Sequence, residues 1–436
     1  MDRREFLKHS LTLAALAPLA RLWGGEGPDG NKTYDRAKGP QVTRRRYKNS
    51  GLTVPLLGFG CMRLPTAGTD SPEIDYATAG KMIADAMAAG CNYFDTAYMY
   101  HGGRSEKCLG ELLRNYPRDS YYLADKMPVW YARKPADLER IFNEQLARCR
   151  TDYFDFYMLH SMGEGNWAQA KKLRAYEFLL AQKKAGRIRK LGFSFHDTPE
   201  LLKEIVQAHP WDFVQLQLNY LDWTVQKGRE KYEMAKEYGL PVIVMEPIRG
   251  GKLAKLPEET MAELNSLRPS ASAASFALRW FQDLDDVFLV LSGMSAMDQM
   301  VDNVAAFEEC DPLSKEEAAI IDGAAEAMKN EIPCTACRYC TSSCPMELDI
   351  PDLLFKYNQI RADSGFTIKM QLDAYLEDKL PSACIGCGAC MEMCPQKIQI
   401  PDELAAFTEA LEKIPSWADI CRERAEAEKK LEEGNK

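Results

Sequence analysis

Two runs of cysteines near the C-terminal end of this 436-residue chain have a spacing suited to metal chemistry. The chain holds 14 cysteines, and eight of them lie between residues 334 and 394. In each run two residues separate the first three cysteines, and a fourth cysteine followed by proline comes after three more residues. The runs are Cys334, Cys337, Cys340 and Cys344, and Cys384, Cys387, Cys390 and Cys394. Thiolates at this spacing can reach three corners of one cubane cluster, so the sequence predicts two 4Fe-4S clusters.

Disulfide bonds and zinc sites are the alternatives for these cysteines. A disulfide framework would not require two copies of one spacing, and the third cysteine after each Cys-x-x-Cys pair disfavours zinc. Between the runs, helical patterns cover Asp352–Arg361 and Lys369–Leu380. This region resembles a two-cluster ferredoxin of the helical type, in which the fourth cysteine of each run ligates the other cluster. The resemblance implies one ligand set of Cys334, Cys337, Cys340 and Cys394, and another of Cys384, Cys387, Cys390 and Cys344.

The region from Tyr47 to about Glu309 alternates short apolar runs with longer stretches of helical periodicity. Apolar runs joined by helices are typical of a parallel sheet. The expected strands are Leu56–Cys61, Tyr93–Thr96, Tyr122–Lys126, Phe154–His160, Lys190–Phe195, Phe213–Leu218, Val242–Glu246 and Phe288–Leu291. The expected helices include Ala77–Ala89, Glu106–Asn115, Pro135–Cys149 and Ala168–Lys184. Eight such units predict an α/β fold, a closed (β/α)8 TIM barrel. An open doubly wound sheet is disfavoured because no Gly-x-Gly-x-x-Gly follows the first strand.

Catalytic groups of such a barrel lie where its strands end. Asp95, Lys126 and His160 lie at the ends of the second, third and fourth expected strands, and Tyr100 closely follows Asp95. Here the sequence resembles the aldo-keto reductase family. The match continues through Gly58-Phe59-Gly60, Gly192-Phe193-Ser194, Gln215, Pro247 and Gly293-Met294-Ser295, with Gln299 and Asn303. Taken singly, Asp95 could cap a helix and Tyr100 could be an aromatic residue at the barrel rim. Lys126 could be a solvated charge, and His160 could be a core histidine. Their joint presence at the family's relative positions favours catalysis.

The chemistry of these four side chains agrees with what the resemblance implies. Reduction of a carbonyl by hydride needs a proton donor, and a tyrosine with a pKa near 10 is a poor one unless a cation helps. Lys126 can supply that charge, and Asp95 can pair with the ammonium, which is costly to bury alone. His160 can donate a hydrogen bond to the carbonyl oxygen as charge develops on it. We therefore expect Tyr100 to be the proton donor.

The resemblance also implies that NAD(P)H is a cofactor. Ser194 and Gln215 would bind its carboxamide, while Ser295 would contact the phosphate end and Asn303 the adenine. Gly293 and Gln299 complete the expected cofactor-binding residues.

The sequence departs from the family at two of its nicotinamide positions. Phe195 and His196 follow Ser194, where the family usually has Asn, and Met245 stands where many members stack a tyrosine. The Gly293–Asn303 loop contains no Lys or Arg for a 2′-phosphate. Either Arg249 or Lys252 could reach that phosphate instead, or both could merely cover the barrel rim. The choice between NADH and NADPH stays open.

Residues 1–30 resemble a twin-arginine export signal. Arg3 and Arg4 precede an apolar run, Leu11–Leu22, that is too short to span a membrane but suits the apolar region of a signal. We expect export to the periplasm or the outer face of the cytoplasmic membrane. The alternative is an N-terminal tail on a cytoplasmic protein. Free nicotinamide cofactor is not expected outside the cytoplasm, so this alternative would also explain how the protein obtains it.

The whole chain is expected to divide into five parts. These are the signal (1–30), a linker (31–46), the barrel (47–325), the ferredoxin-type domain (326–412) and a charged helical tail (413–436). The chain has 55 Lys and Arg against 64 Asp and Glu, a net charge of −9, so nucleic acid is an unsuitable partner. We expect an oxidoreductase acting on a small carbonyl or alcohol, with a redox protein as a possible partner. The alternative is an electron-transfer subunit whose barrel is a docking or nicotinamide-sensing scaffold.

Overall fold

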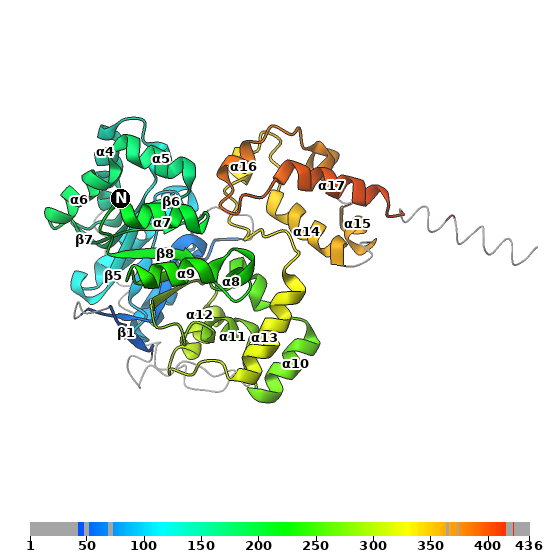
Figure 1. Ribbon diagram of the computed structural model, residues 1–436, viewed down its shortest axis with the longest axis horizontal. Coiled ribbons are helices and arrows are strands. Elements are labelled where there is room, and N and C mark those ends of the chain that lie inside the picture. Colours follow the sequence, from blue (N-terminus) through cyan, green and yellow to red (C-terminus); the bar gives the residue numbers. More distant parts are fainter. Residues whose placement is uncertain are drawn as a thin grey trace, which may run out of the picture. The chain divides into compact units, whose positions relative to one another are not determined.

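A computed structural model describes residues 42–47, 52–68, 73–362, 366–372, 375–415 and 422 (Figure 1). The described residues up to Ile321, apart from Arg249–Leu253, form one compact unit. Arg249–Leu253 and the described residues from Asp322 onward form a second unit. The expected signal, most of the linker and most of the charged tail lie outside the described residues. Among the described helices, none combines the length and the apolar character needed to span a bilayer.

The first unit is a closed barrel of eight parallel strands, as the sequence predicted. Its strands are β3 (Leu57–Gly60), β4 (Tyr93–Asp95), β5 (Tyr122–Met127), β6 (Phe154–Met162), β7 (Ile188–Phe195), β8 (Phe213–Gln217), β9 (Val242–Met245) and β10 (Val287–Gly293). They follow chain order around the barrel, and β10 closes it by pairing with β3. The TIM-barrel prediction is confirmed, and each of the eight expected strands overlaps one of these strands.

Aromatic side chains fill the interior of the barrel where its strands begin. The Phe156 ring lies 5.1 Å from the Tyr93 ring and 5.4 Å from the Phe213 ring. All three are fully buried. The barrel is therefore a packed core, and its reactive groups must lie at the opposite end.

A short hairpin of β1 (Arg44–Arg46) and β2 (Thr53–Pro55) adjoins this packed end. The guanidinium of Arg45 donates to the carbonyl oxygens of Leu284 and Val287, at 2.7 and 2.6 Å. The Tyr47 ring, just after β1, packs edge-on against Phe288 at 4.9 Å. The sequence assigned residues 44–46 to the linker, whereas the structure pairs them with β2 as a strand.

Helices surround the strands (Figure 1). They are α2 (Tyr76–Ala88), α3 (Arg104–Leu112), α4 (Pro135–Cys149), α5 (Glu164–Leu173), α6 (Ala175–Lys184), α7 (Pro199–Ala208), α8 (Asp222–Val225), α9 (Gly228–Glu237), α10 (Glu258–Leu267), α11 (Ala273–Arg279) and α12 (Met297–Ala306), with α13 (Lys315–Met328) after them. The single helix expected over Ala168–Lys184 is wrong, because Arg174 adopts a left-handed conformation (φ 54°, ψ 43°) and separates α5 from α6. Apolar periodicity does not reveal one left-handed residue.

The second unit is helical, and its described residues contain no strand. Its longer helices are α14 (Ile350–Ala362), α15 (Phe366–Leu372) and α17 (Ile400–Glu412), with the short α16 (Ala389–Met393) before α17. The stacked rings of Tyr357 and Phe407, 5.1 Å apart, join α14 to α17. The helix expected over Lys369–Leu380 is wrong in its second half, where only Glu377–Lys379 form a 3-10 turn. Pro381 disfavours helical backbone at the residue before it.

Candidate functional site

Alternation along the strands brings the predicted catalytic side chains to one end of the barrel. Residues two apart on a strand point to the same face. The buried side chains of Tyr93, Ala124, Phe156 and Phe213 belong to one core cluster. Asp95, Lys126, His160 and Gln215 lie two or four residues further along the same four strands. They therefore continue the same inward-facing rows into the end of the barrel where the strands finish.

Lys126 and Asp95 form a buried ion pair. The Lys126 Nζ donates to Asp95 Oδ1 and also to the carbonyl oxygen of Thr96, at 2.7 Å. The side chains are 1% and 5% exposed. Burial raises the pKa of Asp95 above its ordinary value, although Lys126 and a 3.3 Å hydrogen bond from Gln215 Nε2 oppose this. The ammonium is thus held at a fixed point beside the barrel mouth.

Tyr100 lies next to this ammonium. It begins the 3-10 turn Tyr100–Gly103 that follows β4, and the Lys126 Nζ is 4.8 Å from the centre of its ring. The turn folds back sharply because His101, Gly102 and Gly103 all have positive φ angles. The cation lies where it can stabilise the tyrosinate that forms when the hydroxyl gives up its proton.

The His160 ring completes the group. It stands almost perpendicular to the Tyr100 ring (83°), with the ring centres 6.2 Å apart. Burial, together with Lys126 and His196, lowers the pKa of His160 well below its ordinary value, so the ring is neutral. Among the described residues its buried Nδ1 has no hydrogen-bond partner. An orphaned N–H is rarer than an unused acceptor, so we assign the proton to Nε2, where it can be donated to a substrate oxygen.

The two residues expected at the carboxamide lie beside this group. Ser194 on β7 and Gln215 on β8 are register partners, and both are 1% exposed. The Ser194 hydroxyl accepts the Ser161 N–H at 2.7 Å, just after His160. The structure therefore brings an amide and a hydroxyl next to the four predicted catalytic residues.

The other expected cofactor residues lie on the end of β10 and on α12. Ser295 and Gln299 are exposed, and the Ser295 N–H donates to Gln299 Oε1 at 2.8 Å. Asn303 is buried, and its amide donates to Ser292 Oγ at 2.8 Å. Its side chain is therefore held within the barrel wall, whereas Ser295 and Gln299 face solvent.

Sequence reasoning missed Arg63 at this place. The Arg63 carbonyl accepts the Ser295 hydroxyl at 2.7 Å, and its side chain lies 3.4 Å from where a Cβ on Gly293 would stand. β3 and β10 pair in the closed barrel with Gly60 opposite Gly293, so the residues after Gly60 lie beside the β10 loop. Barrel closure was thus the signal that could have found it. In the second unit, Lys252 pairs with Glu331, and Arg249 is buried.

Thiols of the two cysteine runs lie close to one another. Burial first, and then the nearby Cys337, Cys334, Cys394 and Cys390, raises the pKa of Cys340 to about 12. A small cavity of the second unit is lined by Leu348 and Ile350 together with thiols of both runs, namely Cys344, Cys384, Cys387 and Cys390. Cys344 therefore lies with the first three cysteines of the second run, and Cys394 lies near Cys340 of the first run.

The thiols of the two runs are a donor set that suits cubane clusters. None of the described cysteines forms a disulfide. In the part of the chain that the structure describes, no three His, Cys, Asp or Glu side chains converge as one metal ion requires. Zinc needs its ligands about 2.3 Å from one centre, whereas a cubane spreads four thiolates over four irons.

Comparison with known proteins matches both units. Residues 56–326 match the model of the aldo/keto reductase family, which is more than half of the chain. The chain belongs to the aldo/keto reductase family. Residues 333–398 match a 4Fe-4S dicluster domain, so this family member carries an iron–sulfur domain after its barrel.

Several relatives cover the barrel almost completely. L-galactose dehydrogenase of Arabidopsis thaliana is 26% identical over 66% of this chain and 96% of its own length. NADH-specific methylglyoxal reductase of Escherichia coli is 23% identical over 64% and 97%. The holo form of aldo-keto reductase AKR11C1 from Bacillus halodurans superposes with a TM-score of 0.54 at 28% identity, covering 66% of this chain and 97% of that one. The expected enzyme class, an NAD(P)-dependent oxidoreductase of the aldo-keto reductase type, is confirmed.

Proposed function

We propose that this protein interconverts small carbonyl compounds and alcohols with NAD(P)H, and that Tyr100 is the proton donor. One observation carries the proposal: the Lys126 ammonium is paired with Asp95 and also lies 4.8 Å from the Tyr100 ring centre, beside a neutral His160. Such a group serves proton transfer to an oxygen on which negative charge develops. The relative named as a methylglyoxal reductase supports small aldehydes and ketones as substrates.

Each of the four side chains has a separate task. The His160 Nε2–H orients the carbonyl oxygen. The Tyr100 hydroxyl gives it a proton, and the Lys126 ammonium stabilises the tyrosinate that remains. Asp95 keeps the ammonium in place. A bound NAD(P)H supplies the hydride, and the buried Ser194 and Gln215 are the residues available to hold its carboxamide.

The choice between NADH and NADPH depends on the loop after β10. The loop has no cation of its own, but Arg63 lies beside Gly293 and Ser295. We include Arg63 among the residues that would meet a cofactor phosphate.

We also propose two 4Fe-4S clusters, ligated by the two crossed cysteine sets, and a redox protein as their partner. The crossed placement of the cysteines and the dicluster match support the clusters. The dicluster match also favours the second candidate, an electron-transfer subunit with a scaffold barrel. Turnover distinguishes the two, because a scaffold has no need of a proton donor. The twin-arginine segment supports export as a further proposal.

Tyr100→Phe tests the proposal because it removes only the hydroxyl. Turnover of methylglyoxal with NADH or NADPH should fall on the order of 100-fold or more. Affinity for the nucleotide, measured by fluorescence titration, should stay nearly unchanged. Tyr131→Phe is the matched control, since Tyr131 is 47% exposed, and it should leave turnover unchanged. Equal turnover in the wild type and Tyr100→Phe would show that Tyr100 is not the proton donor.

A further inference from the structure

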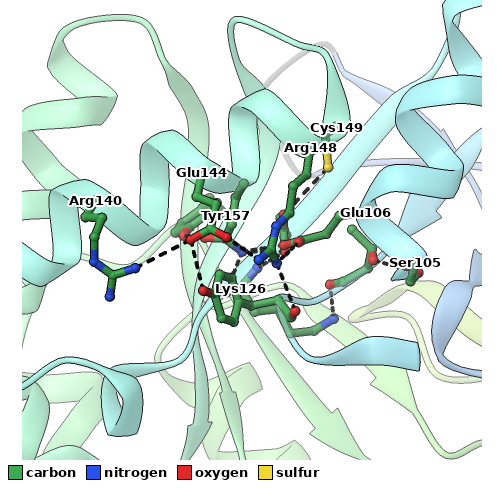
Figure 2. A network of polar contacts seen from close by, with 12 residues as sticks. Ser105, Glu106, Lys126, Arg140, Glu144, Arg148, Cys149 and Tyr157 are labelled. Atoms are coloured by element: carbon green, nitrogen blue, oxygen red, sulfur yellow. Dashed lines mark hydrogen bonds and ion pairs between the residues drawn. The ribbon is translucent and has the colours of Figure 1, made fainter. Parts of the chain in front are cut away.

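A buried polar network lies between β5 and the helices α3 and α4, behind the Lys126 side chain (Figure 2). Asp125, next to Lys126 on β5, points away from the barrel interior because neighbouring residues on a strand face opposite sides. It meets Glu106 of α3 and Gln145 of α4, and all three are fully buried. None of these three residues belongs to the predicted active site.

The network supplies hydrogen bonds that a longer β4 would otherwise give to the backbone of β5. β4 stops at Asp95, which is opposite Ala124, and the Thr96 N–H donates to the Ala124 carbonyl at 3.0 Å. In a parallel sheet, residues two apart on a strand point their N–H and C=O groups toward the same adjacent strand. Lys126 therefore presents its N–H and C=O toward the place where β4 has ended. Buried backbone groups need partners, so other residues must supply them.

Two side chains of the network supply these partners. The Lys126 N–H donates to Asp125 Oδ1 at 2.8 Å. The Lys126 carbonyl accepts from Gln145 Nε2 at 3.0 Å. The peptide groups on both sides of the Lys126 Cα are thus bound, one by each side chain.

The Gln145 amide has one possible orientation. The Tyr157 hydroxyl donates to its Oε1 at 2.5 Å. The two hydrogens of its Nε2 are shared among the Lys126 carbonyl, Glu106 Oε1 at 3.1 Å and Asp125 Oδ1 at 2.8 Å. The reversed amide would place its oxygen against the Lys126 carbonyl, which cannot donate to it, and would turn its NH2 toward the Tyr157 hydroxyl.

Glu106 and Asp125 lie close enough for each to affect the ionisation of the other. Burial raises the pKa of Glu106 above its ordinary value, although Arg148, which donates to Glu106 Oε2 at 2.7 Å, opposes this. Burial, followed by the nearby Glu106, raises the pKa of Asp125 well above its ordinary value. Asp125 is therefore protonated when Glu106 is charged, and its Oδ1 remains an acceptor for Lys126 and Gln145. Asn has the shape and the hydrogen-bonding groups of this protonated acid.

We propose that Asp125 and Gln145 are positioning residues, which hold the Lys126 backbone in place of the missing strand and so fix the ammonium against Asp95 and Tyr100. This inference rests on the proposed function, in which that ammonium assists Tyr100. A displacement of about 1 Å at a catalytic group is enough to cost on the order of 100-fold in rate.

Two variants of Asp125 separate positioning from simple stability. Asp125→Leu keeps the branched shape and removes the acceptor, and it should lower kcat for methylglyoxal at least 10-fold with KM and nucleotide affinity within 2-fold. Asp125→Asn should keep kcat within 3-fold of the wild type. Gln145→Met, which loses both donors but fills the space, should behave like Asp125→Leu. A purely structural role would lower the amount of folded protein without changing kcat per folded active site.

A second readout needs no turnover. A fluorotyrosine at position 100 reports the ammonium beside its ring through its 19F chemical shift. Lys126→Met gives the shift expected when the ammonium is absent. Asp125→Leu and Gln145→Met should move the signal toward that value, and Asp125→Asn should leave it in place.

The outcomes separate the two claims. An inactive wild type with the expected 19F pattern would remove the proposed function and keep the positioning role. An active wild type with unchanged kcat and 19F shift in Asp125→Leu and Gln145→Met would overturn the positioning role. Asp125→Asn as impaired as Asp125→Leu would overturn it as well, because the charge rather than the geometry would then matter.

Discussion

Asp95→Asn should destabilise the barrel because it leaves the Lys126 ammonium buried without a counter-charge. Asn keeps the shape of Asp, and the Thr96 carbonyl still accepts from the Lys126 Nζ at 2.7 Å, so the variant loses the charge alone. Breaking a buried ion pair from one side costs about 3–5 kcal/mol. We therefore expect a loss of about 3–5 kcal/mol.

A second substitution tests whether the unpaired charge is the origin of this loss. Lys126→Met in the Asp95→Asn background removes the unpaired charge and should restore stability to within about 1 kcal/mol of the wild type.

Urea unfolding under anaerobic conditions measures these values. Tryptophan fluorescence suits the barrel unit, which contains Trp130, Trp167, Trp211, Trp223 and Trp280. The two units can unfold separately, so the barrel transition must be fitted by itself. A deficit below about 1 kcal/mol, or a double variant no more stable than Asp95→Asn, would refute the buried charge pair.

Three further predictions concern the clusters, the acid side of the stability curve and the compartment. Anaerobically purified protein should contain about eight irons with matching sulfide, and zinc, or only four irons, would contradict the two clusters. Burial lowers the pKa of His196 to about 4. As the pH falls below about 6.5, the imidazole therefore takes up a proton in the unfolded chain before it does so in the folded protein, and the folded state loses stability until the pH reaches about 4. Denaturant unfolding at pH 7.5 and 5 should show that His196→Asn abolishes about 2 kcal/mol of this loss, and an unchanged difference would exclude His196 as its source. Arg3→Lys with Arg4→Lys should leave the chain in the cytoplasm upon fractionation of a bacterial host, because Lys lacks the guanidinium fork. A wild type found wholly in the cytoplasm would show that the N-terminal segment is not an export signal.

The barrel, and the convergence of the proposed catalytic residues at one end of it, could be predicted because both depend on local patterns. Apolar runs separated by helical periods define eight strands, and parallel strands all end on the same side. Asp95, Lys126 and His160 could thus be placed together without knowledge of any contact. The iron–sulfur domain could be predicted for a related reason, since the spacing within each cysteine run is itself a geometric requirement for binding a cubane cluster.

Features that depend on one particular side chain in another element were not predictable. The Arg45 guanidinium reaches carbonyls more than 200 residues away in the sequence. Arg63 comes beside Gly293 only because β10 closes on β3. No composition or periodicity carries such information, because the partner of each residue is set by packing.

The Lys126 network shows where the boundary between these two kinds of feature lies. The position of Lys126 at the end of β5 follows from the strand pattern, but the hydrogen-bond partners of its backbone groups depend on how far β4 extends. β4 ends at Asp95, and the last hydrogen bond between the two segments joins the Thr96 N–H to the Ala124 carbonyl. The backbone of Lys126 therefore has no strand beside it on that side. Gln145, 19 residues further along the chain, can replace that neighbour only because α4 packs against β5. The strand pattern therefore identifies Lys126 as the residue that carries the positive charge, whereas the length of β4 decides which side chains must bind the Lys126 backbone.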